Sequence, residues 1–138
     1  MSDARVLIVF TTDVLPRLIR SGLQNDGWTC DAAAGVEEGL AMLRAGDHEV
    51  AIIDSPMPDS ENGELAAALL AQRANLYLVV CVDEEGLRPA GDDPRILYRT
   101  KPIDRAGFSA AVSEACTRRA AYIANHPRFG AIATLHEA

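Results

Sequence analysis

Two residues of opposite charge, Asp54 and Lys101, carry the side chains with the most evident chemistry. Each follows an apolar run: Asp54 ends "EVAIID" (49–54), and Lys101 follows "RILYRT" (95–100). Of the 13 lysine and arginine residues, 12 are arginine, and the single lysine is Lys101. A compact ammonium suits one phosphoryl or carboxylate oxygen, whereas a guanidinium fork suits two. A single lysine could stand anywhere by chance, so its neighbours must decide whether Lys101 belongs to a site.

The first apolar run ends without a charged side chain. "RVLIVF" (5–10) leads to Phe10 and then to Thr11 at the turn that follows. In an open α/β domain, this turn commonly contributes to the ligand site. Asp13 lies nearby, but its place directly before a helical pattern suits a helix cap better than a ligand. The expected mouth of the first strand therefore carries no acid.

Strands and helices alternate along the chain, which predicts an α/β fold. Continuous apolar runs indicate strands buried on both faces, and the segments between them show helical spacing. This alternation favours a flavodoxin-like, doubly wound parallel sheet of five strands in the order 2-1-3-4-5. The predicted strands are 5–10, 28–33, 49–54, 76–82 and 95–100, and the predicted helices are 14–25, 35–46, 64–74 and 104–125.

The carboxyl ends of parallel strands meet at one edge of such a sheet, where ligand sites of open α/β proteins lie. The predicted edge carries Phe10, Thr11, Asp54, Cys81 with Val82, and Lys101. This placement gives Asp54 and Lys101 a common site although 46 residues separate them in the chain.

The segment "DEEGLRPAGDDPR" (83–95) is predicted to be a loop with at most one helical turn. It holds two glycines and two prolines. In a helix interior, proline costs roughly 3 kcal/mol and glycine about 1 kcal/mol relative to alanine. We therefore expect the fourth helix of the fold, between the last two strands, to be shortened or missing.

Length and composition indicate one globular domain. The chain has 138 residues, of which 49% are hydrophobic and 24% charged, and a formal net charge of −7. That charge disfavours nucleic acid as a partner, and no apolar run approaches the roughly 18 residues of a membrane span. The N-terminus lacks a signal-peptide pattern, and Cys30, Cys81 and Cys116 show no metal-ligand spacing. We expect a cytoplasmic protein with no membrane partner.

The segments "IIDSPMPDSENG" and "YRTKPID" resemble the receiver domain of bacterial two-component response regulators, over roughly residues 4–120. The resemblance implies that Asp54 stands at the phosphoacceptor position and that Met57-Pro58 belongs to the following loop. It also implies that Lys101 reaches the phosphoryl oxygens, that Pro102 follows a cis peptide bond, and that Tyr98 is a switch residue.

The sequence departs from that family at the metal site. Receiver domains place two adjacent acids after the first strand to bind Mg²⁺, and these positions correspond to Phe10 and Thr11. Mg²⁺ is usually held by one or two carboxylates together with substrate phosphate. Asp59 and Glu61 follow Asp54 in the loop, but solvated loop acids are the simpler interpretation. The only metal ligands to consider are then Asp54 and Asp13, and we expect no metal and no other cofactor.

A second departure concerns the switch at the end of the fourth strand. The resemblance implies a threonine or serine there, whose hydroxyl contacts the phosphoryl group. The position corresponds to Cys81, whose thiol is a weak donor. A slip of one residue would place Val82 there instead, which has no donor. With Tyr98, these are the switch positions of the chain.

Three functions follow from this pattern. The first is a degenerate receiver, or pseudo-receiver, that binds a partner protein without regulated phosphorylation and is not an enzyme. The second is an active phosphoacceptor, modified on Asp54 with an atypical Mg²⁺ site. The third is a small-ligand sensor on the same fold, although the turn after the first strand has no glycine-rich phosphate loop. The expected partner is a signalling protein, such as a histidine kinase or a downstream regulator.

The remaining charged and titratable residues have plainer interpretations. His48, His126 and His136 lie near loops or the tail, and surface positions are expected for all three. The pair Arg118-Arg119 forms a small basic cluster with Arg128. A solvated face is the simpler interpretation of this cluster, and docking to an acidic partner is the alternative.

We divide the chain into a receiver-like domain (1–125) and a C-terminal tail (126–138), with no separate output domain. The tail carries Phe129, Ile132 and Leu135 at a spacing of three. This spacing suits an amphipathic turn that covers the domain's own helices or a neighbouring subunit.

We predict a homodimer that depends on the tail, because apolar surface of this kind is normally covered. Deletion of 126–138 should shift the species seen in analytical ultracentrifugation toward monomer, or expose surface that binds a hydrophobic dye. A full-length chain that stays monomeric at high concentration would contradict the dimer.

Overall fold

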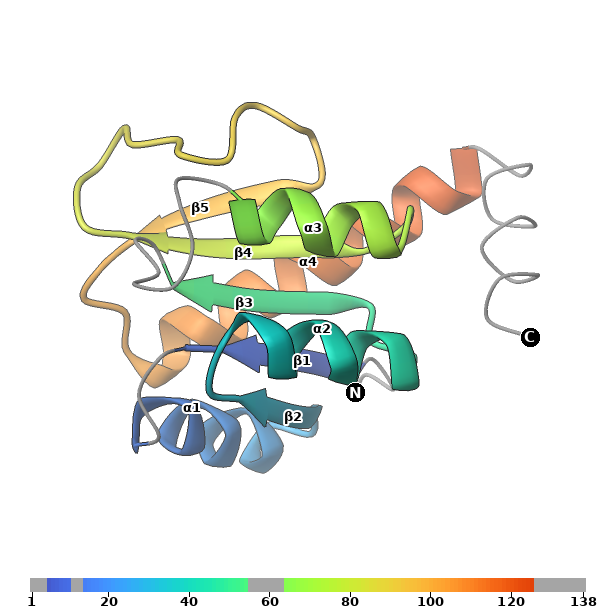
Figure 1. Cartoon of the computed structure of the whole chain (residues 1–138). Coiled ribbons are helices and arrows are strands. Elements are labelled where there is room, and N and C mark those ends of the chain that lie inside the picture. Colours follow the sequence, from blue (N-terminus) through green and yellow to red (C-terminus); the bar gives the residue numbers. More distant parts are fainter. Residues whose placement is uncertain (1–4, 11–13, 55–63, 126–138) are drawn as a thin grey trace.

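The computed structural model describes residues 5–10, 14–54 and 64–125, and in these ranges it shows one five-stranded parallel sheet. The strand order is β2-β1-β3-β4-β5, as the alternation of strands and helices predicts (Figure 1). The strands are β1 (Arg5–Val9), β2 (Thr29–Ala33), β3 (Val50–Asp54), β4 (Tyr77–Val82) and β5 (Ile96–Thr100).

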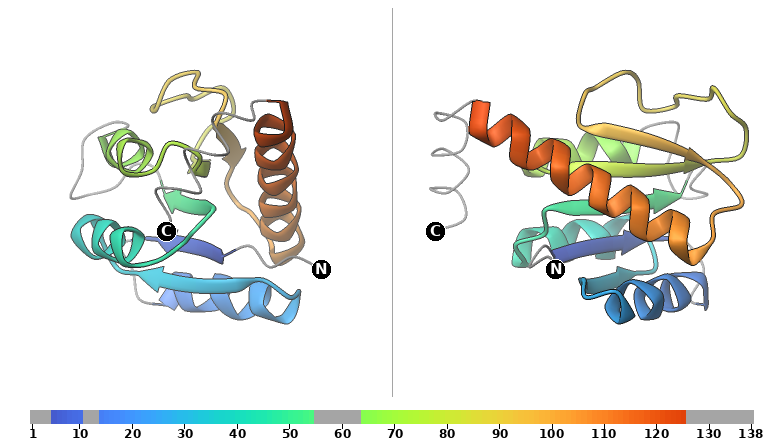
Figure 2. Two further views of the ribbon diagram at one scale, coloured as in Figure 1. Left: turned by 90° about the vertical axis from the view of Figure 1, so that its right-hand side faces the viewer. Right: turned by 180° about the vertical axis from the view of Figure 1, so that it is seen from behind.

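Helices cover both faces of the sheet. Within the described ranges these are α1 (Val14–Asn25), α2 (Val36–Ala45), α3 (Glu64–Gln72) and α4 (Arg105–Asn125). The two helices α1 and α4 pack on one face and α2 and α3 on the other (Figures 1 and 2). None of these helices is long and apolar enough to cross a membrane.

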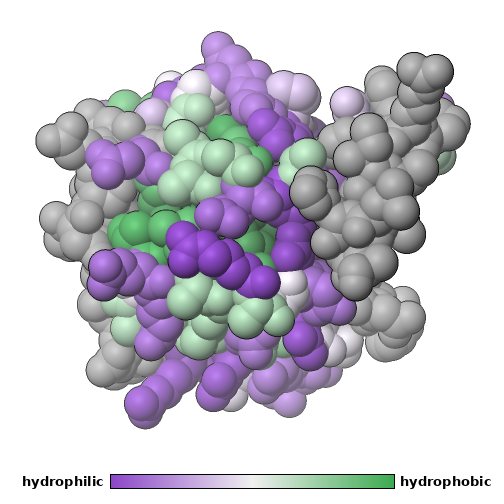
Figure 3. All heavy atoms as spheres, turned by 45° about the vertical axis from the view of Figure 1, so that its right-hand side comes forward, coloured by the Kyte–Doolittle hydropathy of each residue, from purple (hydrophilic) through white to green (hydrophobic). Residues whose placement is uncertain are grey.

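Burial on both faces explains the continuous apolar strands. Along β1, Val6 and Ile8 join the core beneath α1 and α4, whereas Leu7 and Val9 join the core beneath α2 and α3. All six residues of β4 are buried. In Figure 3 the apolar colour gathers in a strip, flanked by polar side chains, on the side that α2 and α3 cover.

The register aligns the carboxyl ends of the strands. Asp54 of β3 pairs with Cys81 of β4, and Val82 pairs with Thr100 of β5. The backbone N–H of Lys101 then donates to the carbonyl of Val82 (2.8 Å), so the ladder continues one residue beyond β5. This register places Asp54 and Lys101 at the same edge.

No helix forms between β4 and β5, as predicted, and the fourth helix in the chain is the C-terminal helix α4. Residues 83–95 instead form three successive turns, each closed by a backbone hydrogen bond from residue i+3 to residue i. These bonds run from Leu87 to Glu84, from Gly91 to Arg88 and from Ile96 to Asp93.

The glycines and prolines of this segment stand where those turns require them. Gly86, at the third position of the first turn, has φ +91°, a conformation that favours glycine. Pro89 and Pro94 occupy the second positions of the other two turns, where their fixed φ is favourable. Gly91 closes the second turn with φ +87°. The composition that disfavours a helix therefore builds a defined loop.

The expectation of a surface position is wrong for His48. Its side chain is only 2% exposed, and Nε2 lies 2.7 Å from Oδ2 of Asp31 on β2. Arg73 shapes this corner by donating hydrogen bonds to the carbonyls of Leu43, Gly46 and His48 (2.9, 2.6 and 2.8 Å). Gly46 allows the imidazole to lie against the backbone, since a Cβ there would come within 2.6 Å of the ring. His126 and His136 lie outside the described residues.

The basic cluster also differs from the expectation of a solvated face. The side chain of Arg119 is 14% exposed, and it forms an ion pair with Glu49 and a hydrogen bond to the carbonyl of Asn75 (2.9 Å). Arg118 is half exposed and pairs with Glu114 one helical turn before it (2.6 Å). Arg128 lies outside the described residues. Arg119 thus fastens α4 to the amino-terminal side of the sheet.

We predict that His48 makes the protein less stable in mild acid. Burial lowers the pKa of His48, the ion pair with Asp31 opposes this effect, and Arg5 and Arg73 reinforce it. The unfolded chain, in which the pKa is about 6.5, therefore binds more protons in this range than the folded chain does. Urea unfolding should show stability that is fully present above about pH 7 and falls as the pH drops toward the lowered folded pKa.

The matched variants separate His48 from the other histidines. His48→Gln should flatten this pH dependence, even if it lowers the stability at every pH. The pair His126→Gln and His136→Gln should leave the dependence intact. A stability that is flat between about pH 7 and pH 5 in the unaltered chain would contradict the assignment to His48.

Candidate functional site

An ion pair joins Asp54 and Lys101 at the carboxyl edge of the sheet. Asp54 is the last residue of β3, and Lys101 directly follows β5. Lys101 Nζ lies 2.6 Å from Asp54 Oδ1, and both side chains are partly buried, with 30% and 21% of their surfaces exposed. The sequence-based placement of the two residues in one site is correct. The Lys101–Pro102 peptide bond is cis, the isomer that the resemblance implies.

A third charged residue, Asp83, belongs to this site and was missed from the sequence. It directly follows β4, and its Oδ1 lies 3.0 Å from Lys101 Nζ. The signal was available, since the residue after any central strand reaches the same edge of a parallel sheet. The acidic run "DEE" (83–85) made Asp83 look like an ordinary loop residue. Lys101 therefore lies between two carboxylates.

The two carboxylates stabilise the charged form of Lys101. Partial burial alone lowers the pKa of the ammonium, but the hydrogen bonds that it donates to Asp54 and Asp83 outweigh burial, and the pKa is raised above its usual value. The ammonium thus stays protonated throughout the physiological range. It supplies a permanent positive charge beside Asp54, although the two carboxylates leave the group of three residues with a net negative charge.

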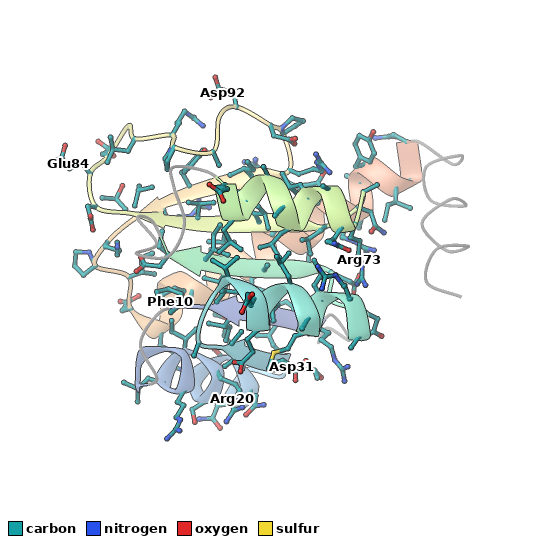
Figure 4. The ribbon with its side chains drawn as sticks, in the orientation of Figure 1. Phe10, Arg20, Asp31, Arg73, Glu84 and Asp92 are labelled. Atoms are coloured by element: carbon teal, nitrogen blue, oxygen red, sulfur yellow. The ribbon has the colours of Figure 1, made fainter. Side chains whose placement is uncertain are left out.

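Phe10 fills the end of β1 with an apolar ring. Its side chain is 2% exposed and belongs to the core beneath α1 and α4, while its backbone N–H donates to the carbonyl of Ala33 (3.2 Å). Figure 4 shows Phe10 at the end of β1, enclosed among other side chains. A phenyl ring offers no oxygen to a cation, so this side chain cannot supply a metal ligand.

Several residues of the predicted site lie outside the described residues. They are Thr11, Asp13, Met57, Pro58, Asp59 and Glu61. In the part of the chain that is described, no group of three or more histidine, cysteine, aspartate and glutamate side chains could hold a metal ion. The two described carboxylates of the edge, Asp54 and Asp83, both contact Lys101.

Cys81 pairs with Asp54 in the register of β3 and β4, which is the position that the resemblance implies for a switch hydroxyl. Its side chain is fully buried in the core beneath α1 and α4. Burial, together with the negative charge of Asp54, raises the pKa of the Cys81 thiol to about 12. The thiol is therefore neutral, and it is a weak hydrogen-bond donor.

Tyr98, the other expected switch residue, contacts the 83–95 loop. Its hydroxyl accepts a hydrogen bond from the backbone N–H of Ala90 (2.9 Å) and donates one to the carbonyl of Gly91 (2.8 Å). The ring packs partly against the core beneath α2 and α3. The structure thus places Asp54, Asp83 and Lys101 together, with Cys81 beside them, and engages the Tyr98 hydroxyl elsewhere.

An open groove of about 570 Å³ lies between the end of β5 and the start of α4. Its lining includes Thr100, Pro102, Ile103 and Gly107, and it does not include Asp54 or Lys101. The ion pair at the sheet edge is therefore not part of this groove.

No family model matches the sequence, and neither does any curated protein with which it was compared. Solved structures do match. A CheY-like response regulator receiver domain protein from Methanospirillum hungatei is 23% identical with a TM-score of 0.76, covering 88% of this chain and 99% of that one. A response regulator receiver domain protein from Clostridium thermocellum is 20% identical with a TM-score of 0.74, covering 86% and 98%.

A third match carries a different description. A chain described as adenylate cyclase from Rhodopirellula baltica is 17% identical with a TM-score of 0.82, and the match covers 94% of this chain and 98% of that one. At these identities the likeness is one of fold. The chain has the CheY-like receiver fold.

We predict that Asp83 contributes to the raised pKa of Lys101. Because Lys101 is the only lysine, reductive ¹³C-methylation labels this side chain and the terminal amine alone. The Lys101 resonance should titrate above the ordinary lysine value of about 10.4, and Asp83→Asn should lower its midpoint. Glu84→Gln, the matched change at the next residue, should leave the midpoint in place. Equal midpoints in the unaltered chain and Asp83→Asn would contradict the contact.

Proposed function

We propose that this chain is a receiver-like signalling protein that binds a partner protein without regulated phosphorylation. The observation that carries the proposal is the burial of Phe10 at the end of β1. In the family that the sequence resembles, this position holds an acid of the Mg²⁺ site. In this chain the same place is part of the hydrophobic core.

The charges at the edge support the same proposal. Transfer of a phosphoryl group to a carboxylate needs positive charge beside the negatively charged equatorial oxygens, which a divalent cation usually supplies. The described ligands of the edge are Asp54 and Asp83, and Lys101 engages both. A missing charge-stabilising contact typically costs about 3 kcal/mol in the transition state, or roughly a hundredfold in rate. Without both acids, phosphorylation of Asp54 should be too slow for signalling.

In this proposal Asp54 has a structural role, as the partner of the Lys101 ammonium. The protein is then not an enzyme and needs no cofactor. Its partner is another signalling protein, such as a kinase or a downstream regulator, in the cytoplasm, and the chain itself forms a homodimer. Neither nucleic acid nor a membrane is a partner.

The active phosphoacceptor is the second candidate, and one observation favours it. Asp54 and Lys101 lie 2.6 Å apart at one edge, which is the arrangement in which a lysine can reach an oxygen of a phosphorylated Asp54. An active phosphoacceptor would require that residues other than Phe10 bind the Mg²⁺ ion. A small-ligand sensor is less supported, because the groove beside α4 does not include the charged edge.

We predict no Mg²⁺-dependent phosphorylation of Asp54 by acetyl phosphate. Intact-mass analysis should show no added phosphoryl group in the unaltered chain, with a receiver domain that has both acids run in parallel as the positive control. The Lys101 methyl resonance should also stay in place when Mg²⁺ and beryllofluoride are added. Phosphate uptake that needs both Mg²⁺ and Asp54, at the rate of the positive control, would establish the phosphoacceptor instead.

Two variants test the physical cause. Asp54→Asn should leave the activity of the protein in its own cells unchanged, because that activity does not pass through a phosphorylated aspartate. Phe10→Asp combined with Thr11→Asp restores the two acids. If the smaller side chain at position 10 leaves space for a cation at the end of β1, this double variant should bind Mg²⁺. It should then accept phosphate at least about a hundredfold faster than the unaltered chain.

A further inference from the structure

The second turn of the 83–95 loop is held to β5 by one hydroxyl group. In the turn Arg88–Gly91, the N–H of Ala90 donates to the Tyr98 hydroxyl and the carbonyl of Gly91 accepts from it. Both distances, 2.9 and 2.8 Å, are those of ordinary hydrogen bonds. The hydroxyl thus uses its single hydrogen as donor and one lone pair as acceptor on adjacent residues of one turn.

A charged side chain of the same turn covers the Tyr98 ring. The guanidinium carbon of Arg88 lies 5.1 Å from the ring centroid, within the range of a cation–π contact. Asp92 pairs with Arg88 (Nε to Oδ1, 3.4 Å), so the loop also orients the guanidinium. The turn therefore contacts Tyr98 through its backbone and through its first side chain.

The rest of the segment has its own attachments. The side chain of Asp93 accepts from the N–H and the guanidinium of Arg95, and Arg95 Nη1 donates to the carbonyl of Ala74 before β4. Asp83 is held at the other end by Lys101. Among the described residues, the middle turn is bonded to the sheet through the Tyr98 hydroxyl.

We propose that Tyr98 holds the 88–92 part of the loop in one conformation, as a fixed pin that does not depend on the ion pair between Asp54 and Lys101. Rotation of the ring away from the turn would leave the N–H of Ala90 and the carbonyl of Gly91 without the hydroxyl and would break the contact with Arg88. The helix that would cover this edge is absent, and the pinned loop takes its place. This inference concerns the loop, and it stands whether or not Asp54 takes up phosphate.

The contacts of Tyr98 fix the conformation of the loop, and therefore the positions of the side chains that the loop exposes beyond β5. Figure 1 shows the segment as a broad arch past the edge strand, and Figure 4 shows Glu84 and Asp92 pointing outward from it. Leu87, the last residue of the first turn, is 46% exposed. A partner that contacts this arch meets one arrangement of these side chains.

Amide hydrogen exchange of the full-length chain, followed by NMR, tests the pin at its own donor. Tyr98→Phe keeps the ring and removes the hydroxyl, and it should speed exchange of the Ala90 amide about two- to tenfold, the effect of one net hydrogen bond. Tyr77→Phe, which removes a tyrosine hydroxyl from β4, is the matched control and should not change Ala90. Arg88→Gln should speed the same exchange about two- to fivefold.

Asp54→Asn removes the charge that pairs with Lys101, and it tests whether the conformation of the loop is independent of this ion pair. Exchange of Ala90 should stay within about twofold of the unaltered chain. The proposal is overturned if Tyr98→Phe changes Ala90 by less than about twofold, or if Asp54→Asn changes it by more. Because the readout is an amide in the loop, failure here is distinct from any result with acetyl phosphate.

Discussion

Burial of the sheet on both faces is the constraint on which the rest of this structure depends. Because helices cover each face, the central strands β1, β3 and β4 are apolar along most of their length, and charged groups lie at their ends. Phe10 continues the apolar segment one residue beyond β1, so the buried core reaches the edge where charged groups would otherwise begin. Asp54 and the residues that directly follow β4 and β5 then carry the charge of the edge.

The charged side chains at this edge compensate one another because Lys101 lies between two carboxylates. Asp54 and Asp83 are both within 3.0 Å of its Nζ, and Asp54 is the more buried of the two carboxylates. A partly buried carboxylate next to the Phe10 end of the core needs a counter-charge, since an unpaired charge there would lose hydration without compensation. The single lysine of the chain supplies it, and its flexible stem lets one ammonium reach two oxygens from different strands.

What the sequence could and could not predict follows from how local each signal is. The strand order, the common edge of Asp54 and Lys101, and the absence of a helix from 83–95 rest on patterns within each segment, and these predictions are confirmed. The burial of His48 is not local. It depends on Asp31 from β2 and on Arg73 from the turn after α3, and no spacing along the chain predicts either contact. The ion pair of Arg119 was not predicted for the same reason, because its partner Glu49 is 70 residues away in the chain.

A receiver signals only if its site has two arrangements of similar free energy and the incoming group prefers one of them. In this chain the residues at the two switch positions are tightly held. A rotated Tyr98 would give up two hydrogen bonds and the Arg88 contact, and Cys81 is enclosed in the core with no strong donor to offer. Loss of the Tyr98 contacts would raise the free energy of an arrangement in which the ring has rotated away from the loop. These contacts stabilise the arrangement that the structure shows, and the function proposed above, binding of a partner without regulated phosphorylation, would need only this arrangement.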